Sequence, residues 1–268
     1  MRWLRMRKKG ERQEAMLQRA ADAGDLDSMA SLGVLLEEQG EAEGARTWYQ
    51  RAADAGHTPA MSNLGLLLEE QGEVEEARTW YERAAGAGLP TAMFNLGLLL
   101  NKQGDTEGAR TWYRRAADAG DPEAMHNLGV LLLREQDTEG ARVWCERAAD
   151  AGHTGAMCNV GNLLRLEGDT EGARGWYQRA ADRGDSDATY NLGVLLSEQG
   201  DIEGARTWYE RAADAGERDA MFNLGVLLEQ QGEVEGARAW LQRAADAGVP
   251  EALNALRDRG GAAGGASG

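Results

Sequence analysis

AMFNLGLLLNKQGDTEGARTWYRRAADAG, residues 92–120, is the stretch that decides the fold, because near-copies of it recur at a fixed spacing. Its Leu-Gly pair, Leu96-Gly97, recurs every 32 residues and occurs seven times in all, once in the form Val-Gly. The tryptophan keeps the same step, at Trp48, Trp80, Trp112, Trp144, Trp176, Trp208 and Trp240. A repeat of about 20–50 residues is typical of chains built from stacked structural units. The spacing predicts seven full units from Asp25 to Gly248, with about half a unit before and half a unit after.

Each unit is predicted to contain two helices separated by a glycine. In the second unit, Ala60, Leu64 and Leu68 recur at helical spacing, and Tyr81 belongs to a second set with the same period. Gly72 lies between the sets, where a helix can end in a left-handed residue that glycine adopts without steric cost. Aspartates that can cap the second helices stand at Asp105, Asp137, Asp169 and Asp201.

A single hairpin of this kind cannot hold its own fold, because its few apolar side chains do not offset the entropy of ordering the chain. Each hairpin must therefore pack against the next. The sequence predicts an all-α solenoid of seven 32-residue helix-turn-helix repeats with a half repeat at each end. Its predicted core consists of the Trp-Tyr pairs and the paired leucines Leu35-Leu36, Leu67-Leu68, Leu99-Leu100, Leu131-Leu132, Leu163-Leu164, Leu195-Leu196 and Leu227-Leu228.

The motifs AMFNLG (92–97), ARTWY (109–113) and AADAG (116–120) resemble the Sel-one-like (Sel1-like) repeat, SLR, a branch of the tetratricopeptide repeat superfamily. The resemblance covers nearly the whole chain. It implies a right-handed superhelix whose first helices line a concave groove, and an adaptor that binds proteins or peptides without catalysis. One departure is the turn inside each unit (104–109), which is short, as in a plain tetratricopeptide repeat.

Composition restricts the function further. The 268 residues carry a formal net charge of −16, which argues against a nucleic-acid groove and favours a basic partner. The two cysteines, Cys145 and Cys158, do not make a disulfide scaffold, so we expect a cytoplasmic protein. No apolar run approaches the ~20 residues that a membrane-spanning helix needs. The excess of arginine over lysine and the abundant alanine and glycine indicate a bacterial source with a GC-rich genome.

The ends differ from the repeats. We expect a basic tail over residues 1–10, the solenoid over 11–260 and a flexible Gly/Ala tail over 261–268. The start, MRWLRMRKKGER (1–12), is basic but has no apolar segment typical of a secretory signal. It could contact an anionic membrane surface, or the acidic ends of its own or a neighbour's groove.

An asparagine precedes the Leu-Gly pair in six successive units, at Asn63, Asn95, Asn127, Asn159, Asn191 and Asn223. A primary amide offers two donors and one acceptor, so such an asparagine ladder could hold an extended peptide. This resembles the ladders of the tetratricopeptide domain of protein O-linked N-acetylglucosamine transferases and of importin alpha-type receptors. The alternative is that each amide bonds to a neighbouring helix and sets the stacking angle.

Six hydrogen bonds do not suffice for binding, so apolar anchors are needed. The residue before each asparagine varies, and its bulky members are candidate anchors: Phe94, His126, Tyr190 and Phe222. Two residues after each Leu stand further candidates, including Leu66 and Leu98. One turn further on, the cations Lys102, Arg134 and Arg165 could meet an acidic group or a C-terminal carboxylate of the ligand.

We find no nucleophile paired with a base, no metal-ligand spacing and no phosphate loop, so we expect no catalysis, metal or cofactor. The sequence thus predicts a protein–protein interaction adaptor that binds an extended peptide or partner protein. The alternative is a self-assembling or membrane-peripheral structural scaffold.

Overall fold

The computed structural model describes residues 14–264, and every regular element among them is an α-helix. After a first helical stretch over residues 14–22, the helices are α2 (Leu26–Glu38), α3 (Ala42–Asp54), α4 (Thr58–Glu70), α5 (Val74–Gly86), α6 (Pro90–Lys102), α7 (Thr106–Asp118), α8 (Pro122–Arg134), α9 (Thr138–Asp150), α10 (Thr154–Leu166), α11 (Thr170–Ala181), α12 (Ser186–Glu198), α13 (Ile202–Asp214), α14 (Arg218–Gln230), α15 (Val234–Asp246) and α16 (Pro250–Gly264). The prediction of two helices in each 32-residue repeat is confirmed.

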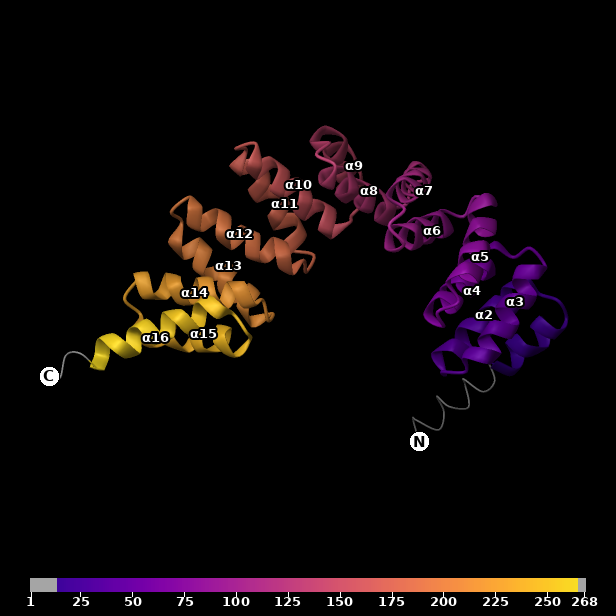
Figure 1. Ribbon diagram of the computed structural model, residues 1–268, viewed down its shortest axis with the longest axis horizontal. Helices are drawn as coiled ribbons and strands as arrows, with labels where there is room; N and C mark the ends of the chain where they lie inside the picture. The colour runs from indigo at the N-terminus through magenta and orange to yellow at the C-terminus, as the bar shows by residue number, and fades with distance from the viewer. Residues whose placement is uncertain (1–13, 265–268) are drawn as a thin grey trace. The chain divides into compact units, whose positions relative to one another are not determined.

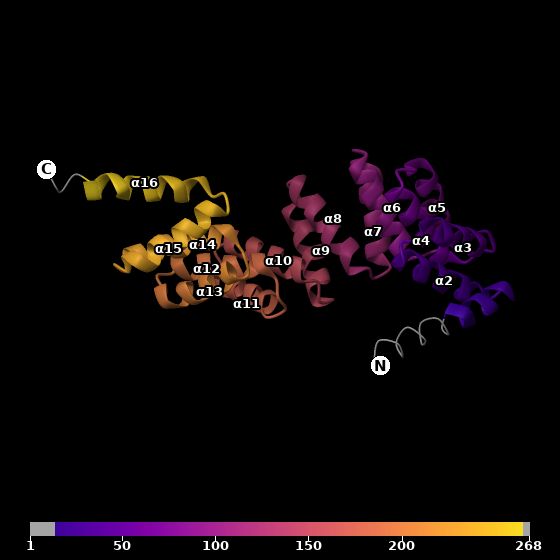
Figure 2. The same ribbon diagram turned by 90° about the horizontal axis from the view of Figure 1, so that it is seen from below.

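The chain divides within α8 into two compact units, residues 1–131 and 132–268. In each of them, consecutive helices pack side by side as hairpins, and each hairpin packs on the next (Figures 1 and 2). In the first unit the hairpins are α2/α3, α4/α5 and α6/α7; in the second they include α10/α11, α12/α13 and α14/α15. The all-α repeat solenoid predicted from the sequence is therefore confirmed.

The helix boundaries follow the predicted caps. The N–H of Gly108 donates to the Asp105 carboxylate at 2.9 Å, and Gly204 does the same to Asp201 at 3.0 Å. The helices end at left-handed glycines, such as Gly72 with φ 82°. Gln136 takes the place of one of these glycines and adopts φ 65°, so the turn keeps its shape without glycine.

The Leu-Gly pair is explained by the way the two helices of a hairpin meet. The tyrosine of the second helix packs against the glycine of the first, as Tyr81 does against Gly65 and Tyr177 against Gly161. Both tyrosine rings are fully buried. A Cβ at Gly65 would lie 2.6 Å from Cε1 of Tyr81, closer than carbon atoms approach. The glycine therefore sets the distance between the two helices of the hairpin.

The paired leucines and the tyrosines form the core as predicted, with Leu35 half-buried as the one exception among the leucine pairs. Among the tryptophans, Trp80 and Trp144 are buried and the others in the repeats are half-buried.

The arginine three residues after each tryptophan of the repeats is exposed on the second helix. Each of these arginines stacks over its own tryptophan, with 4.0–5.0 Å between the guanidinium carbon and the ring centroid. Arg211 also donates from Nη2 to the backbone oxygen of Ala181 in the preceding repeat, at 2.8 Å. This arginine therefore links the second helices of neighbouring repeats.

A second arginine position also links repeats, and it was missed. Arg46 on α3 makes two hydrogen bonds to Glu73 at the start of α5, at 2.6 and 2.9 Å. Arg206 makes the corresponding contact with Glu233, and Arg142 bonds to Glu167, which takes the place of Gln71, another partner of Arg46. The matching signal is a carboxylate 25–27 residues after each arginine.

The predicted limits of the solenoid stay predictions. Helix α16 runs to Gly264, so it includes the first residues of the expected Gly/Ala tail. The basic segment 1–12, with its predicted membrane or self contact, and residues 265–268 lie outside the described residues.

Candidate partner-binding face

We define the first-helix face as the six ladder asparagines and their neighbours on α4, α6, α8, α10, α12 and α14. The asparagines lie beside the buried leucines, as their position predicts. Five of them are half-buried, and Asn95 is only 8% exposed. The same position of the first helix therefore forms the face in each repeat, and such positions occur in both compact units.

The ladder amides make different contacts. Asn223 Nδ2 donates to the Tyr190 hydroxyl of the preceding repeat at 3.0 Å. Asn191 Nδ2 lies 3.4 Å from both Cys158 Sγ and Asn162 Oδ1. Asn127 donates to the backbone oxygen of Glu123 in its own helix at 2.9 Å. Asn191 and Asn223 therefore help to join neighbouring repeats, which was the alternative interpretation of the ladder.

The variable position before each asparagine contacts the hairpin's own second helix and the following repeat. The Phe94 ring lies 6.0 Å from that of Tyr113, and the Tyr190 ring lies 6.1 Å from that of Tyr209. Both side chains are half-buried, as are His126 and Phe222. These candidate anchors therefore pack partly into the repeats and leave part of their surface to solvent.

Two of the three candidate cations are paired with carboxylates of a neighbouring repeat. Lys102 Nζ lies 2.7 Å from Glu69 Oε1, and Arg165 Nη1 lies 3.3 Å from Glu198 Oε1. Arg134 is exposed at the end of α8. Lys102 and Arg165 are therefore not free to meet a ligand carboxylate without giving up these pairs.

Carboxylates near the ends of first helices also accept hydrogen bonds from the core tyrosines. The Tyr81 hydroxyl donates to Glu69 at 3.1 Å, and the Tyr49 hydroxyl donates to Glu37 at 2.7 Å. Burial, with the neighbouring carboxylate, raises the pKa of both tyrosines. Burial likewise raises the pKa of Tyr177 to about 12. The phenols therefore stay protonated and act as donors at neutral pH.

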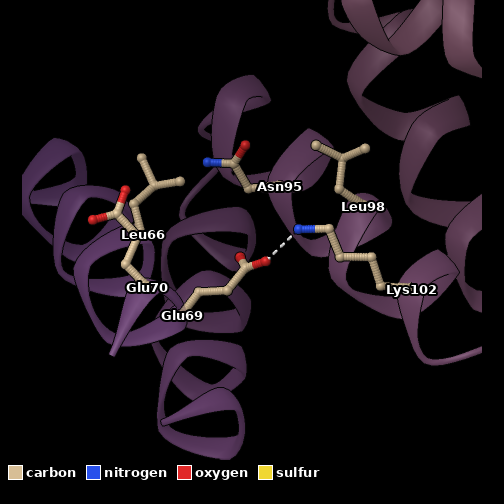
Figure 3. Close-up of a pocket in the computed structure, with 6 residues that line it drawn as sticks. All are labelled: Leu66, Glu69, Glu70, Asn95, Leu98 and Lys102. Carbon is tan, nitrogen blue, oxygen red and sulfur yellow. Dashed lines mark hydrogen bonds and ion pairs between the residues drawn. The ribbon is translucent and has the colours of Figure 1, made fainter. Parts of the chain in front are cut away.

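The face is hollowed at two equivalent places. A pocket of about 330 Å³ lies between α4 and α6 and is lined by Leu66, Glu69, Glu70, Asn95, Leu98 and Lys102 (Figure 3). Four repeats later, a pocket of about 130 Å³ is lined by Ser197, Tyr209, Asn223, Val226, Leu227 and Gln230. Asn223, Val226 and Gln230 correspond to Asn95, Leu98 and Lys102. The hollow between α4 and α6 therefore has an equivalent between α12 and α14, whose lining contains no charged side chain.

Both cysteines are free and buried. Burial raises the pKa of Cys145 to about 11 and that of Cys158 to about 12. We expect both to react with the thiol reagent DTNB near pH 8 at least about 100-fold more slowly in the folded chain than in denaturant, since only an accessible thiolate reacts. The absorbance of the released thiolate measures both rates, and Cys158→Ser assigns them. Equal rates in folded and denatured protein would contradict this burial.

The described residues contain no cluster of three or more metal-ligating side chains. Over the same part of the chain, no helix combines the length and the apolar character needed to cross a bilayer.

Hairpins stacked in sequence, with one side-chain face repeated along them, define an α-helical repeat protein. The tetratricopeptide repeat family model matches residues 14–59, 88–124 and 190–252, more than half of the chain, and a related tetratricopeptide model matches 60–85. The Sel1 repeat model matches residues 122–153 and 155–185. The chain therefore belongs to the tetratricopeptide repeat superfamily as a Sel1-like repeat protein.

Solved structures agree with this assignment. A Sel1 repeat protein from Oxalobacter formigenes is 28% identical, with a TM-score of 0.67 over 81% of this chain and 99% of that chain. The protective antigen c5321 of uropathogenic Escherichia coli, which displays an SLR fold, is 25% identical, with a TM-score of 0.53 over 92% of this chain and 67% of that chain. PilF of Pseudomonas aeruginosa shares the fold at 18% identity, with a TM-score of 0.60 over 71% of this chain and 91% of that chain.

The comparison with curated protein sequences gave no significant match. Tetratricopeptide and Sel1 repeats are in general protein–protein interaction modules and typically non-catalytic, so the partners of this class are proteins.

Proposed function

We propose that the chain is a non-catalytic adaptor that binds an extended peptide or a partner protein along its first-helix face. The observation that carries the proposal is the pocket found at two equivalent places, between α4 and α6 and between α12 and α14. In both copies a ladder asparagine lies next to an apolar side chain, Leu98 in one and Val226 in the other. A repeated pocket that combines an amide with an apolar wall suits a ligand with a regular backbone.

In this proposal the ladder asparagines hold the ligand's backbone and the bulky side chains before them provide apolar contact. Where Asn191 and Asn223 use their nitrogen to join repeats, the amide oxygen can still accept a hydrogen bond from a ligand N–H. Each such bond contributes only ~0.5–1.5 kcal/mol, so Phe94, His126, Tyr190 and Phe222 supply the remaining contact.

We expect alanine at both Asn127 and Asn159 to reduce partner capture at least about tenfold while leaving the fold intact, since each lost bond is worth about a kcal/mol. The measurement is affinity capture from the native lysate, quantified by mass spectrometry and compared with the wild-type chain.

The matched control is alanine at Gln50 and Gln178, which removes two amide side chains from the second helices. Both double variants are first checked for an unchanged far-ultraviolet circular dichroism spectrum. If the asparagine variant captured the same proteins in the same amounts as the control, the ladder would have no role in binding.

A further inference from the structure

We propose that the pocket between α4 and α6 receives a basic side chain, arginine or lysine, from an extended peptide segment of the partner. This inference rests on the proposed function and names the chemistry of the ligand at one position. Three observations carry it: an amide and a carboxylate that have no partner among the described residues, and an apolar wall on each side.

The amide is that of Asn95. Its Nδ2 atom is buried and has no hydrogen-bond partner among the described residues. In the equivalent pocket, Asn223 Nδ2 donates to the hydroxyl of Tyr190. The residue in the place of Tyr190 is Ser62, whose side chain is too short to take this role. An unpaired buried donor is costly, and a ligand that brings an acceptor removes the cost.

The carboxylate is that of Glu70. Glu69 already accepts from Lys102 at one oxygen and from Tyr81 at the other. Glu70 is exposed, and no hydrogen bond or ion pair joins it to another described residue. In the equivalent pocket between α12 and α14, none of the six lining residues is charged. The α4–α6 pocket thus offers one uncompensated negative charge.

The apolar walls are Leu66, which is 41% exposed, and Leu98. Figure 3 shows the Asn95 amide between these leucines, with its nitrogen on the Leu66 side, and Glu70 next to Leu66. Arginine and lysine carry a charge on an apolar stem, so the stem can lie between the leucines with the cation at Glu70. The Asn95 amide can turn about its broad χ2 torsion toward the carbonyl of the same ligand residue.

An acidic ligand fits this pocket poorly. Lys102, the cation that would receive it, is held by Glu69, and Glu70 repels a second carboxylate. The sequence suggested that an acidic group of the ligand binds Lys102, and the ion pair of Lys102 and the charge of Glu70 disfavour such binding.

The test is a nuclear magnetic resonance titration of the full chain, labelled at leucine methyls and side-chain amides, with acetyl-Ala-Gly-Arg-Gly-Ala-amide. We expect saturable shifts of the Leu66 and Leu98 methyls and of the Asn95 amide, and at least fivefold weaker binding when glutamine or glutamate replaces arginine in the peptide. Glu70→Gln should weaken binding of the arginine peptide at least fivefold. Glu75→Gln, which removes one negative charge from α5 outside the pocket, should leave the affinity for this peptide unchanged.

A second variant, Ser62→Tyr, supplies Asn95 with the partner that Asn223 has, and should abolish the shifts while the chain stays folded. Shifts of other first-helix-face residues without Leu66 and Leu98, or an unchanged titration of Glu70→Gln, would overturn this inference and leave the adaptor proposal standing. Arginine-specific shifts at the pocket, combined with unchanged partner capture by the Asn127 and Asn159 variant, would support the pocket and count against the ladder.

Discussion

Gly161→Ala is expected to lower the free energy of unfolding by about 3 kcal/mol, as overpacking of a tight core does. The new Cβ would lie 2.5 Å from Cε1 of Tyr177. The ring cannot easily move away, because it is fully buried and its hydroxyl donates to Asn162 Oδ1 at 2.7 Å. Urea unfolding followed by circular dichroism measures the change.

The control for this substitution is Gly175→Ala in the second helix of the same hairpin. Gly175 lies inside α11 and is exposed, and a Cβ added there would meet open space within 4 Å. Alanine there should raise stability by about 0.5–1 kcal/mol, because glycine is a poor helix former. If Gly161→Ala were as harmless as Gly175→Ala, the contact between glycine and tyrosine would not set the helix spacing.

Tyr81→Ala is expected to cost about 3–5 kcal/mol, the usual loss when a buried aromatic side chain is removed. Tyr81 is fully buried against Gly65, so its loss leaves a cavity between α4 and α5. Tyr81→Phe should cost only about 1 kcal/mol, because it removes one hydrogen bond while Glu69 keeps its pair with Lys102.

Urea unfolding at neutral pH distinguishes the two Tyr81 variants, and Glu69→Gln provides the control for the hydrogen bond. Tyr81→Phe in the Glu69→Gln background should cost less than in the wild type. Equal losses for Tyr81→Phe and Tyr81→Ala would mean that the hydroxyl, and not the ring, supplies most of the stabilisation.

The sequence predicted the hairpins well because their determinants are local and repeated. The helix-ending glycines, the capping aspartates and the apolar period each act within one unit, and most units repeat them. The tyrosine 16 residues after a Leu-Gly glycine was predicted as core, but its contact with that glycine was not, since the contact depends on how closely two helices approach.

The surface was harder to predict, because the partners of a side chain lie in other turns or other repeats. Six of the seven arginines that follow a tryptophan of the repeats by three residues also have an aspartate three residues further on, on the same helix. Spacing alone does not decide between the aspartate and the indole, and the structure places the arginine over the indole, as Arg179 lies over Trp176. The state of Asn95 depends on a residue 33 positions earlier, Ser62, so the asparagine pattern by itself treats all six amides as equal.

The contact of Asn191 and Asn223 with the variable residue of the preceding unit has a consequence for evolution. Genes that contain near-identical segments gain and lose copies by unequal recombination, and a step of 32 codons leaves every remaining hairpin with a neighbour of the same shape. At the new junction, however, a residue such as Ser62 or Tyr190 meets an asparagine that it did not meet before. A change in copy number can therefore open or fill a hollow without any point mutation, and so alter which ligands the chain accepts.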